Sequence, residues 1–165
     1  MLPLHIAARF NRDPIVKMLV ERSVNINGLD AKFGFTALHW AVIEGNEEIA
    51  LYLLKNGANA EIVNELNGQS VLSLAVSVGR AKLVSEILKR STDIDKMKLN
   101  SLLHEGLTGK HFDVVEILLR HGADPNAVNS HGLSAIASIN DSKFGKLLVT
   151  SGAKIVFLDA CRLGL

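Results

Sequence analysis

The sequence predicts an all-α fold, an α-solenoid of about five helix–turn–helix repeats with short β-like hairpins and a partial sixth repeat. One observation is a set of hydroxyl residues at spacings of 34, 31 and 33, namely Thr36, Ser70, Ser101 and Ser134. Each is followed by a short run of small and apolar residues and then by a longer apolar run with helical periodicity. Three of the longer runs end in Gly-Ala, at Gly57, Gly122 and Gly152.

The shorter runs are predicted to form the first helix of each repeat. They read "LPLHIAARFN", "TALHWAVIEG", "SVLSLAVSVG", "SLLHEGLTGK" and "SAIASIN". A Ser or Thr hydroxyl at the start accepts a hydrogen bond from the unpaired N–H groups of the first turn, and Pro3 suits a first helical position. Gly45 and Gly79 fit a left-handed helix end, where Asn11 is the next best residue. Lys110 takes this place in the fourth repeat, with Gly109 as an alternative.

The longer runs are predicted to form the second helices. They read "PIVKMLVE", "EIALYLLK", "KLVSEILK", "DVVEILLR" and "KLLVTS", and their apolar residues follow the helical period of 3.6. Gly34, Gly68 and Gly132 each stand two residues before a hydroxyl residue and supply turn backbone, which predicts a hairpin there. One helix pair cannot bury its apolar face alone, so stacked pairs must form the core.

Two repeats depart from the pattern. The segment between Ser91 and Ser101 is three residues short, and Leu99 stands where a turn Gly is expected. In the fifth repeat Ser134 and Gly152 are 18 residues apart, against 21 for the matching pair in the second repeat, so we expect a trimmed first helix or interhelix turn.

We interpret residues 1–165 as a single repeat domain. The repeats are expected at about 1–33, 34–67, 68–98, 99–131 and 132–154, with a partial repeat at 155–165. Solenoid ends normally carry polar caps, whereas Leu2 and Ile6 near one end and Ile155 and Phe157 near the other are apolar. We therefore expect a segment of a longer array; the alternative is that the half-repeats act as caps.

At these residues the chain resembles the ankyrin repeat family, whose motif reads roughly G-x-T-P-L-H-x-A-A-x-x-G. The resemblance covers nearly the whole chain. It implies a rigid, non-catalytic scaffold that binds another protein in a concave groove and at the hairpin tips. It also implies that His5, His39 and His104, at the motif His position, are struts that bond loop backbone and hydroxyl groups.

The family's variable positions give the candidate partner-binding residues. They are Arg9, Phe10, Lys32, Phe33, Phe35, Trp40, Ile43, Glu44, Leu66, Asn67, Gln69, Ser77 and Val78. The same positions in later repeats are Met97, Lys98, Asn100, Thr108, Gly109, Ser130, His131 and Leu133. Phe10, Phe33, Phe35 and Ile43 are apolar where side chains are expected to face solvent, and such clusters often mark interaction sites. The alternative is that some of the Phe side chains pack between hairpins. Trp40 is expected to lie mostly in the interior.

Composition argues against several other classes of function. Lys and Arg number 18 against 17 Asp and Glu, with no basic stripe, which argues against nucleic acid. No apolar run approaches the ~20 residues needed for membrane insertion. The single Cys161 favours a reducing, cytoplasmic compartment, or a host cytosol for a secreted effector. We expect a monomer.

Nothing in the sequence predicts catalysis. The phosphate-binding motifs GxGxxG and the P-loop are missing, and the three motif His residues lie one or more repeats apart, so they do not converge on one metal ion. We expect no enzyme activity, cofactor or metal. The alternative function is a regulatory or targeting ankyrin segment of a larger enzyme, channel or bacterial effector whose activity lies outside these residues.

Overall fold

The computed structural model describes residues 1–64, 66, 68–91, 94–155 and 157–164. The chain forms two compact units, Met1–Ile87 and Leu88–Leu165. Every named element in these described ranges is a helix, and the only β-structure found there is two isolated antiparallel bridges. The predicted all-α class of helix–turn–helix repeats with short β-like hairpins is confirmed.

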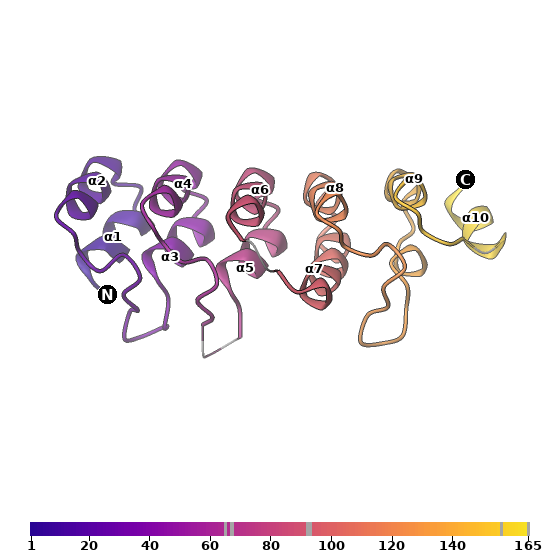
Figure 1. Ribbon diagram of the computed structural model, residues 1–165, viewed down its shortest axis with the longest axis horizontal. Coiled ribbons are helices and arrows are strands. Elements are labelled where there is room, and N and C mark those ends of the chain that lie inside the picture. The colour runs from indigo at the N-terminus through magenta and orange to yellow at the C-terminus, as the bar shows by residue number, and fades with distance from the viewer. Residues whose placement is uncertain (65, 67, 92–93, 156, 165) are drawn as a thin grey trace. The chain divides into compact units, whose positions relative to one another are not determined.

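The first unit is built from three helix pairs in two layers. The pairs are α1 (Pro3–Arg9) with α2 (Asp13–Glu21), α3 (Ala37–Ile43) with α4 (Glu47–Lys55), and α5 (Val71–Ser77) with α6 (Ala81–Arg90), whose last residues extend past the unit boundary. Within this unit α1, α3 and α5 lie side by side in one layer, and the second helices form the other (Figure 1). Leu38, Leu53 and Leu72 are fully buried in the core of this unit.

The expected helix ends of the first unit are confirmed. The Thr36 hydroxyl accepts the His39 N–H at 3.3 Å, and the Ser70 hydroxyl accepts the Ser73 N–H at 3.3 Å. Asn11 has φ 54°, as expected for a left-handed end without glycine. Gly45 and Gly79 have φ 76° and 73°.

The second unit contains α7 (Lys96–Thr108), α8 (Phe112–Arg120), the 3-10 helix η1 (Ile136–Ser138), α9 (Ser142–Thr150) and α10 (Phe157–Leu163). The first helix of the fifth repeat is reduced to η1, as its short spacing predicted. Lys110 adopts φ 57° at the end of α7, whereas Gly109 has φ −72°. The alternative assignment of this turn to Gly109 is therefore wrong.

Helix α7 begins at Lys96, six residues before the start that a cap at Ser101 predicts. Its N-terminal cap is Asp95, whose carboxylate accepts the Met97 N–H at 3.2 Å, so the expectation that Ser101 caps this helix is wrong. The physical reason is the missing turn Gly: Leu99 favours helix and is only 6% exposed, so the segment continues the helix toward its N-terminus. Met97, Lys98 and Asn100 therefore lie on a helix and not at a hairpin tip.

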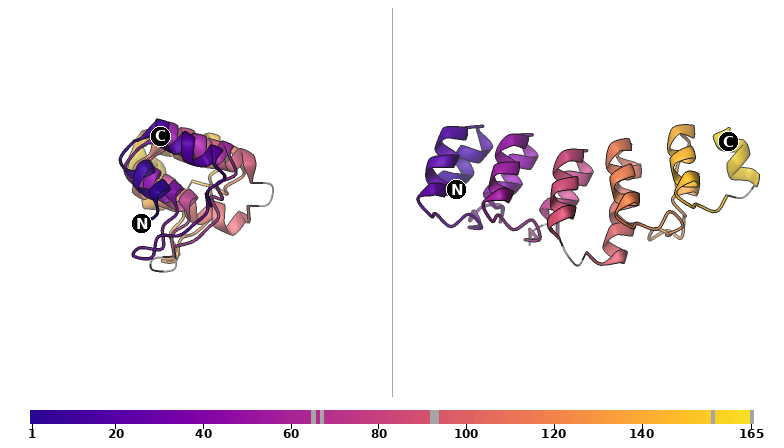
Figure 2. Two further views of the ribbon diagram at one scale, coloured as in Figure 1. Left: turned by 90° about the vertical axis from the view of Figure 1, so that its left-hand side faces the viewer. Right: turned by 45° about the horizontal axis from the view of Figure 1, so that its top comes forward.

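The hairpins of each unit project away from its second helices (Figure 1 and Figure 2). An Asx residue recurs at the base of each tip, where its backbone carbonyl accepts the N–H of a glycine with positive φ. The donor–acceptor pairs are Gly34 to Asp30 at 3.0 Å, Gly68 to Asn64 at 2.8 Å and Gly132 to Asn129 at 2.9 Å. This recurring geometry fixes the position of the tip residues.

Candidate functional site

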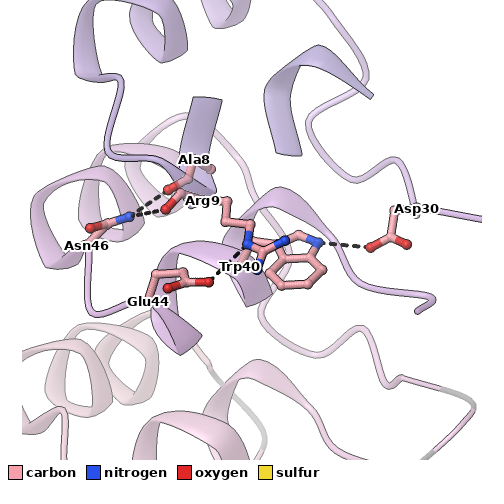
Figure 3. Close-up of polar contacts among 6 residues, drawn as sticks. All are labelled: Ala8, Arg9, Asp30, Trp40, Glu44 and Asn46. Atoms are coloured by element: carbon pink, nitrogen blue, oxygen red, sulfur yellow. Dashed lines mark hydrogen bonds and ion pairs between the residues drawn. The ribbon is translucent and has the colours of Figure 1, made fainter. Parts of the chain in front are cut away.

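The side chain of Trp40 is anchored in the interior of the first unit by Asp30. The indole Nε1–H donates to Asp30 Oδ2 at 2.8 Å (Figure 3). The other carboxylate oxygen accepts the backbone N–H groups of Lys32 at 3.0 Å and Phe33 at 2.7 Å. These bonds join the hairpin tip to α3, which follows it in the chain. The link is buried, because Trp40 is 5% exposed and Asp30 2%. Trp40 lies mostly in the interior, as expected.

These hydrogen bonds decide the charge state of Asp30. Burial by itself would raise the pKa of this carboxyl. The Phe33 N–H, the Trp40 indole and the Lys32 N–H all stabilise the carboxylate, and together they lower the pKa of Asp30 below its ordinary value. The group is therefore a carboxylate at neutral pH and serves as a structural acceptor.

Arg9, at the end of α1, lies over the same indole. Its guanidinium carbon is 4.6 Å from the centre of the Trp40 ring, and its Nε donates to Glu44 Oε1 at 3.0 Å (Figure 3). The two charged side chains are each 37% exposed, so their ion pair contributes only modestly to stability. Its main effect is to hold Arg9 in one place on the surface.

Asn46 ties the end of α1 to the turn between α3 and α4. Its Nδ2 donates to the carbonyl oxygens of Ala8 at 2.8 Å and Arg9 at 3.0 Å (Figure 3). These carbonyls belong to the last turn of a helix, where no intrahelical partner is available. The two first helices are thus held together at the candidate surface.

Phe33 and Phe35 pack on Trp40 instead of standing free. Their ring centroids lie 5.5 Å and 5.3 Å from that of Trp40, in edge-on geometry. The two Phe rings stack at 6.2 Å, and Phe35 also stacks on His39 at 5.3 Å. Both Phe side chains are half-buried. The contacts favour the alternative that these Phe residues pack as part of the hairpin structure.

The candidate partner-binding residues other than Trp40 fall into two groups by the exposure of their side chains. Those exposed are Phe10, Lys32, Ile43, Glu44, Leu66 and Val78. Those half-buried are Arg9, Phe33, Phe35, Gln69 and Ser77. Asn67 lies outside the described residues. Phe10 at 57%, Ile43 at 37% and Val78 at 38% put one exposed apolar side chain at the C-terminal end of each of α1, α3 and α5.

The motif His residues make the contacts expected of struts, with one difference. The Nε2 atoms of His5 and His104 bond the loop carbonyls of Gly28 at 2.9 Å and Ala127 at 3.0 Å. His39 Nδ1 lies 2.8 Å from the Thr36 hydroxyl, but its Nε2 is buried and has no hydrogen-bond partner among the described residues. Burial lowers the pKa of His39, an effect that the nearby backbone of Gln69 opposes.

Sequence reasoning missed the Asx residues that organise this surface. Asp30, Asn64 and Asn129 occupy the same place in three hairpins, and each accepts N–H groups of its own tip through Oδ1. The recurrence of Asx at this position, before a turn Gly, was the available signal. Asn46 carried no such periodic signal.

The described part of the chain has neither a metal-binding cluster nor a membrane-spanning helix. No group of three or more His, Cys, Asp or Glu side chains there is arranged to hold a metal ion. Cys161 is exposed and unpaired by any disulfide. None of the helices described is both long and apolar enough to cross a bilayer.

Comparison with known proteins gives one family. A family model described as ankyrin repeats in three copies matches residues 1–64 and 56–129. The two matches together span the region from α1 to the hairpin that follows α8.

Several curated relatives match over most of the chain. A B-cell lymphoma 3 protein homolog from Mus musculus is 30% identical over 161 residues, which is 92% of this chain and 36% of that protein. A putative palmitoyltransferase ZDHHC13 from Danio rerio is 32% identical over 81% of this chain and 21% of its own length. The palmitoyltransferase AKR1 of Lachancea kluyveri is 30% identical over 81% of this chain and 19% of its own length. The chain thus spans between about a fifth and a third of these relatives.

Proposed function

Because the chain belongs to the ankyrin-repeat family, whose repeats bind other proteins, we propose that it is a non-catalytic protein-binding module whose first unit holds the partner. The binding surface is the C-terminal ends of α1, α3 and α5, which the resemblance places at the concave groove, together with the neighbouring hairpin tips. The observation that carries this proposal is the exposed apolar side chain at each of those three helix ends, Phe10, Ile43 and Val78.

The surroundings of these side chains support recognition by a preorganised surface. Arg9 is fixed beside Phe10 by Glu44 and Trp40, so little side-chain entropy is lost when a partner binds it. Aromatic residues and Arg are the usual anchors of protein interfaces, with a polar rim around them. Lys32 and Leu66, the latter 73% exposed, stand at the hairpin tips and extend the same surface.

Site-specific photo-crosslinking tests the location. Benzoylphenylalanine placed at Ile43 or Val78 in living cells is expected to trap a partner protein. The same group at Lys55, exposed at the end of α4 in the layer of second helices, is the matched control. Equal trapping from Lys55, or trapping from Lys55 alone, would contradict the proposed surface.

Substitution then measures the contribution of the apolar residues. Phe10→Ser with Ile43→Ser is expected to weaken binding of the trapped partner at least about tenfold, because two exposed apolar anchors are lost and neither residue belongs to the buried core. The unfolding midpoint serves as the control and is expected to stay nearly unchanged. Unaltered affinity would remove these residues from the interface.

A second candidate function is favoured by the relatives. Two of them are palmitoyltransferases by name, and this chain corresponds to only 21% and 19% of their lengths. The repeats can then be a regulatory or targeting segment of a larger protein. Sequencing of the gene on both sides of this segment, followed by an activity assay of the full product with and without residues 1–165, distinguishes this function from a stand-alone module.

A further inference from the structure

A cleft in the second unit separates the start of α7 from the hairpin that follows α8. It has a volume of about 480 Å³. Met97 and Asn100 of α7 and Val128 and Asn129 of the hairpin are among its lining residues. The cleft lies entirely within the second unit. Met97, Asn100 and Ser130 stand at variable positions that the family resemblance already singles out, whereas Val128 and Asn129 do not.

The cleft stands where the first unit has an extended segment of its own chain. In the first unit the hairpin tip that contains Phe33 lies beside the next hairpin, and Asn64 Nδ2 donates to the Phe33 carbonyl oxygen at 2.7 Å. In the second unit the corresponding preceding segment belongs to α7, because that helix begins at Lys96. The hairpin of Asn64 therefore lies against the extended backbone of the preceding hairpin. The hairpin of Asn129 instead lies against the start of a helix, and the cleft separates the two.

Helix α7 replaces one of the two contacts made by a preceding hairpin, but not the other. In the first unit Asn27 Oδ1 accepts the Asn59 N–H at 2.8 Å, and in the second unit Asn100 Oδ1 accepts the Asp124 N–H at 2.7 Å in the same way. The contact that Asn64 makes to Phe33 has no such replacement among the described residues. Asn129 stands at the same place as Asn64 and lines the cleft.

Among the described residues, the side-chain amide of Asn129 forms hydrogen bonds through its oxygen only. Its Oδ1 accepts the N–H groups of His131 at 2.9 Å and Leu133 at 3.1 Å, which fixes the orientation of the amide. Its Nδ2 has no hydrogen-bond partner in the part of the chain that the structure describes, whereas Asn64 Nδ2 binds a backbone carbonyl. The cleft thus offers a fixed N–H donor suited to a carbonyl of an extended chain.

The cleft also has apolar walls that face solvent. Met97 is 78% exposed on α7, and Val128 is 62% exposed on the hairpin. Thioether and branched aliphatic side chains of this kind pack well against an inserted aliphatic group. A peptide that buried such a group here would remove both from water.

We propose that this cleft binds an extended peptide segment of a partner protein. A backbone carbonyl of the peptide accepts a hydrogen bond from Asn129 Nδ2, as the Phe33 carbonyl does from Asn64, and a branched aliphatic side chain packs between Met97 and Val128. The amide of Asn129 would recognise the peptide backbone, and the two apolar residues would select the shape of one peptide side chain. This combination recurs in peptide recognition.

The test uses a phage-displayed library of random dodecapeptides selected against the whole chain. The expected result is enrichment of peptides that share a Val, Ile or Leu and carry no charge beside it. A synthetic peptide of the enriched sequence should shift the NMR signals of the Asn129 side-chain amide and of the Met97 and Val128 methyl groups. Failure to enrich any peptide, or shifts confined to the first unit, would overturn the proposal.

Matched variants separate the hydrogen bond from the fold. Asn129→Asp keeps the Oδ1 acceptor, as Asp30 does at the same place in the first unit, but removes the Nδ2 donor. It should weaken the peptide about five- to tenfold, the effect of one lost hydrogen bond in an interface. Met97→Gln and Val128→Thr keep the helix and the extended backbone and should weaken it by a similar factor. Unchanged affinity in all three would rule out this cleft.

The outcome is independent of the proposed function. The Phe10→Ser and Ile43→Ser variant lies in the first unit and should bind the selected peptide as the wild type does. Loss of peptide binding in that variant would place the peptide on the first unit and overturn the assignment to the cleft.

Discussion

Replacement of Asp30 by Asn tests whether the buried link to Trp40 fixes the first hairpin. The carboxylate accepts three hydrogen bonds, two from backbone N–H groups of the tip and one from the indole. An Asn side chain has one acceptor oxygen. If that oxygen serves the tip, as in Asn64, the amide NH₂ faces the indole N–H, and two donors meet in a buried place.

The expected loss of stability follows from these contacts. A hydrogen bond to a charged group contributes about 1.5–3 kcal/mol, and a buried donor without a partner costs about 1–3 kcal/mol. Asp30→Asn should therefore lower the free energy of unfolding by about 2 kcal/mol. The same change in a Trp40→Phe background should cost less than about 1 kcal/mol, because no indole donor is left unpaired.

Urea unfolding followed by far-UV circular dichroism measures both values. With a slope of about 2 kcal/mol/M, the single variant should shift the midpoint by roughly 1 M. An equal cost of Asp30→Asn in the wild-type and Trp40→Phe backgrounds would mean that the two changes are additive, and it would refute the link.

The same variant has an expected effect on acid stability. The pKa of Asp30 is lowered in the folded state, so its contribution is present above the unfolded pKa near 3.8 and is lost as pH falls through the folded pKa. Asp30→Asn should lack this part of the acid dependence, which urea midpoints measured at a series of pH values below 5 would reveal.

Three further predictions concern packing, protonation and backbone strain. Phe33→Ala with Phe35→Ala should lower the stability of the first unit by about 2–4 kcal/mol, since both rings are half-buried, and an unchanged melting temperature would show that they only face solvent. Burial lowers the pKa of His39 below 6.5, so as pH falls the unfolded chain binds the proton more readily than the folded chain. Lowering the pH from 7.5 to 5.5 should therefore lower the urea midpoint, and it should lower the midpoint less in His39→Ser. Lys110→Gly should raise the free energy of unfolding by about 0.5–1 kcal/mol, because glycine adopts a φ of 57° without strain. Gly122→Ala should lower the free energy of unfolding by a similar amount in the same assay, because φ is 95° there although the space around the residue is open.

The sequence by itself determined the repeat and most of its helix ends. Periodic hydroxyl caps, left-handed ends such as Asn11 and Gly45, and turn glycines are local devices. Each satisfies or redirects backbone groups within a few residues of itself, so its effect can be read from its position in the chain. The short spacing after Ser134 predicted a trimmed first helix for the same reason, and the structure has only the 3-10 turn η1 there.

The tertiary structure alone decided where α7 begins and which candidates contact one another. The early start of α7 depends on burial of Leu99 and on a cap at Asp95, neither of which the motif spacing contains. The packing of Phe33 and Phe35 on Trp40 depends on how a hairpin folds over the helix after it. Such contacts join residues across the fold, and their energy depends on distance and burial, which periodicity in one dimension does not specify.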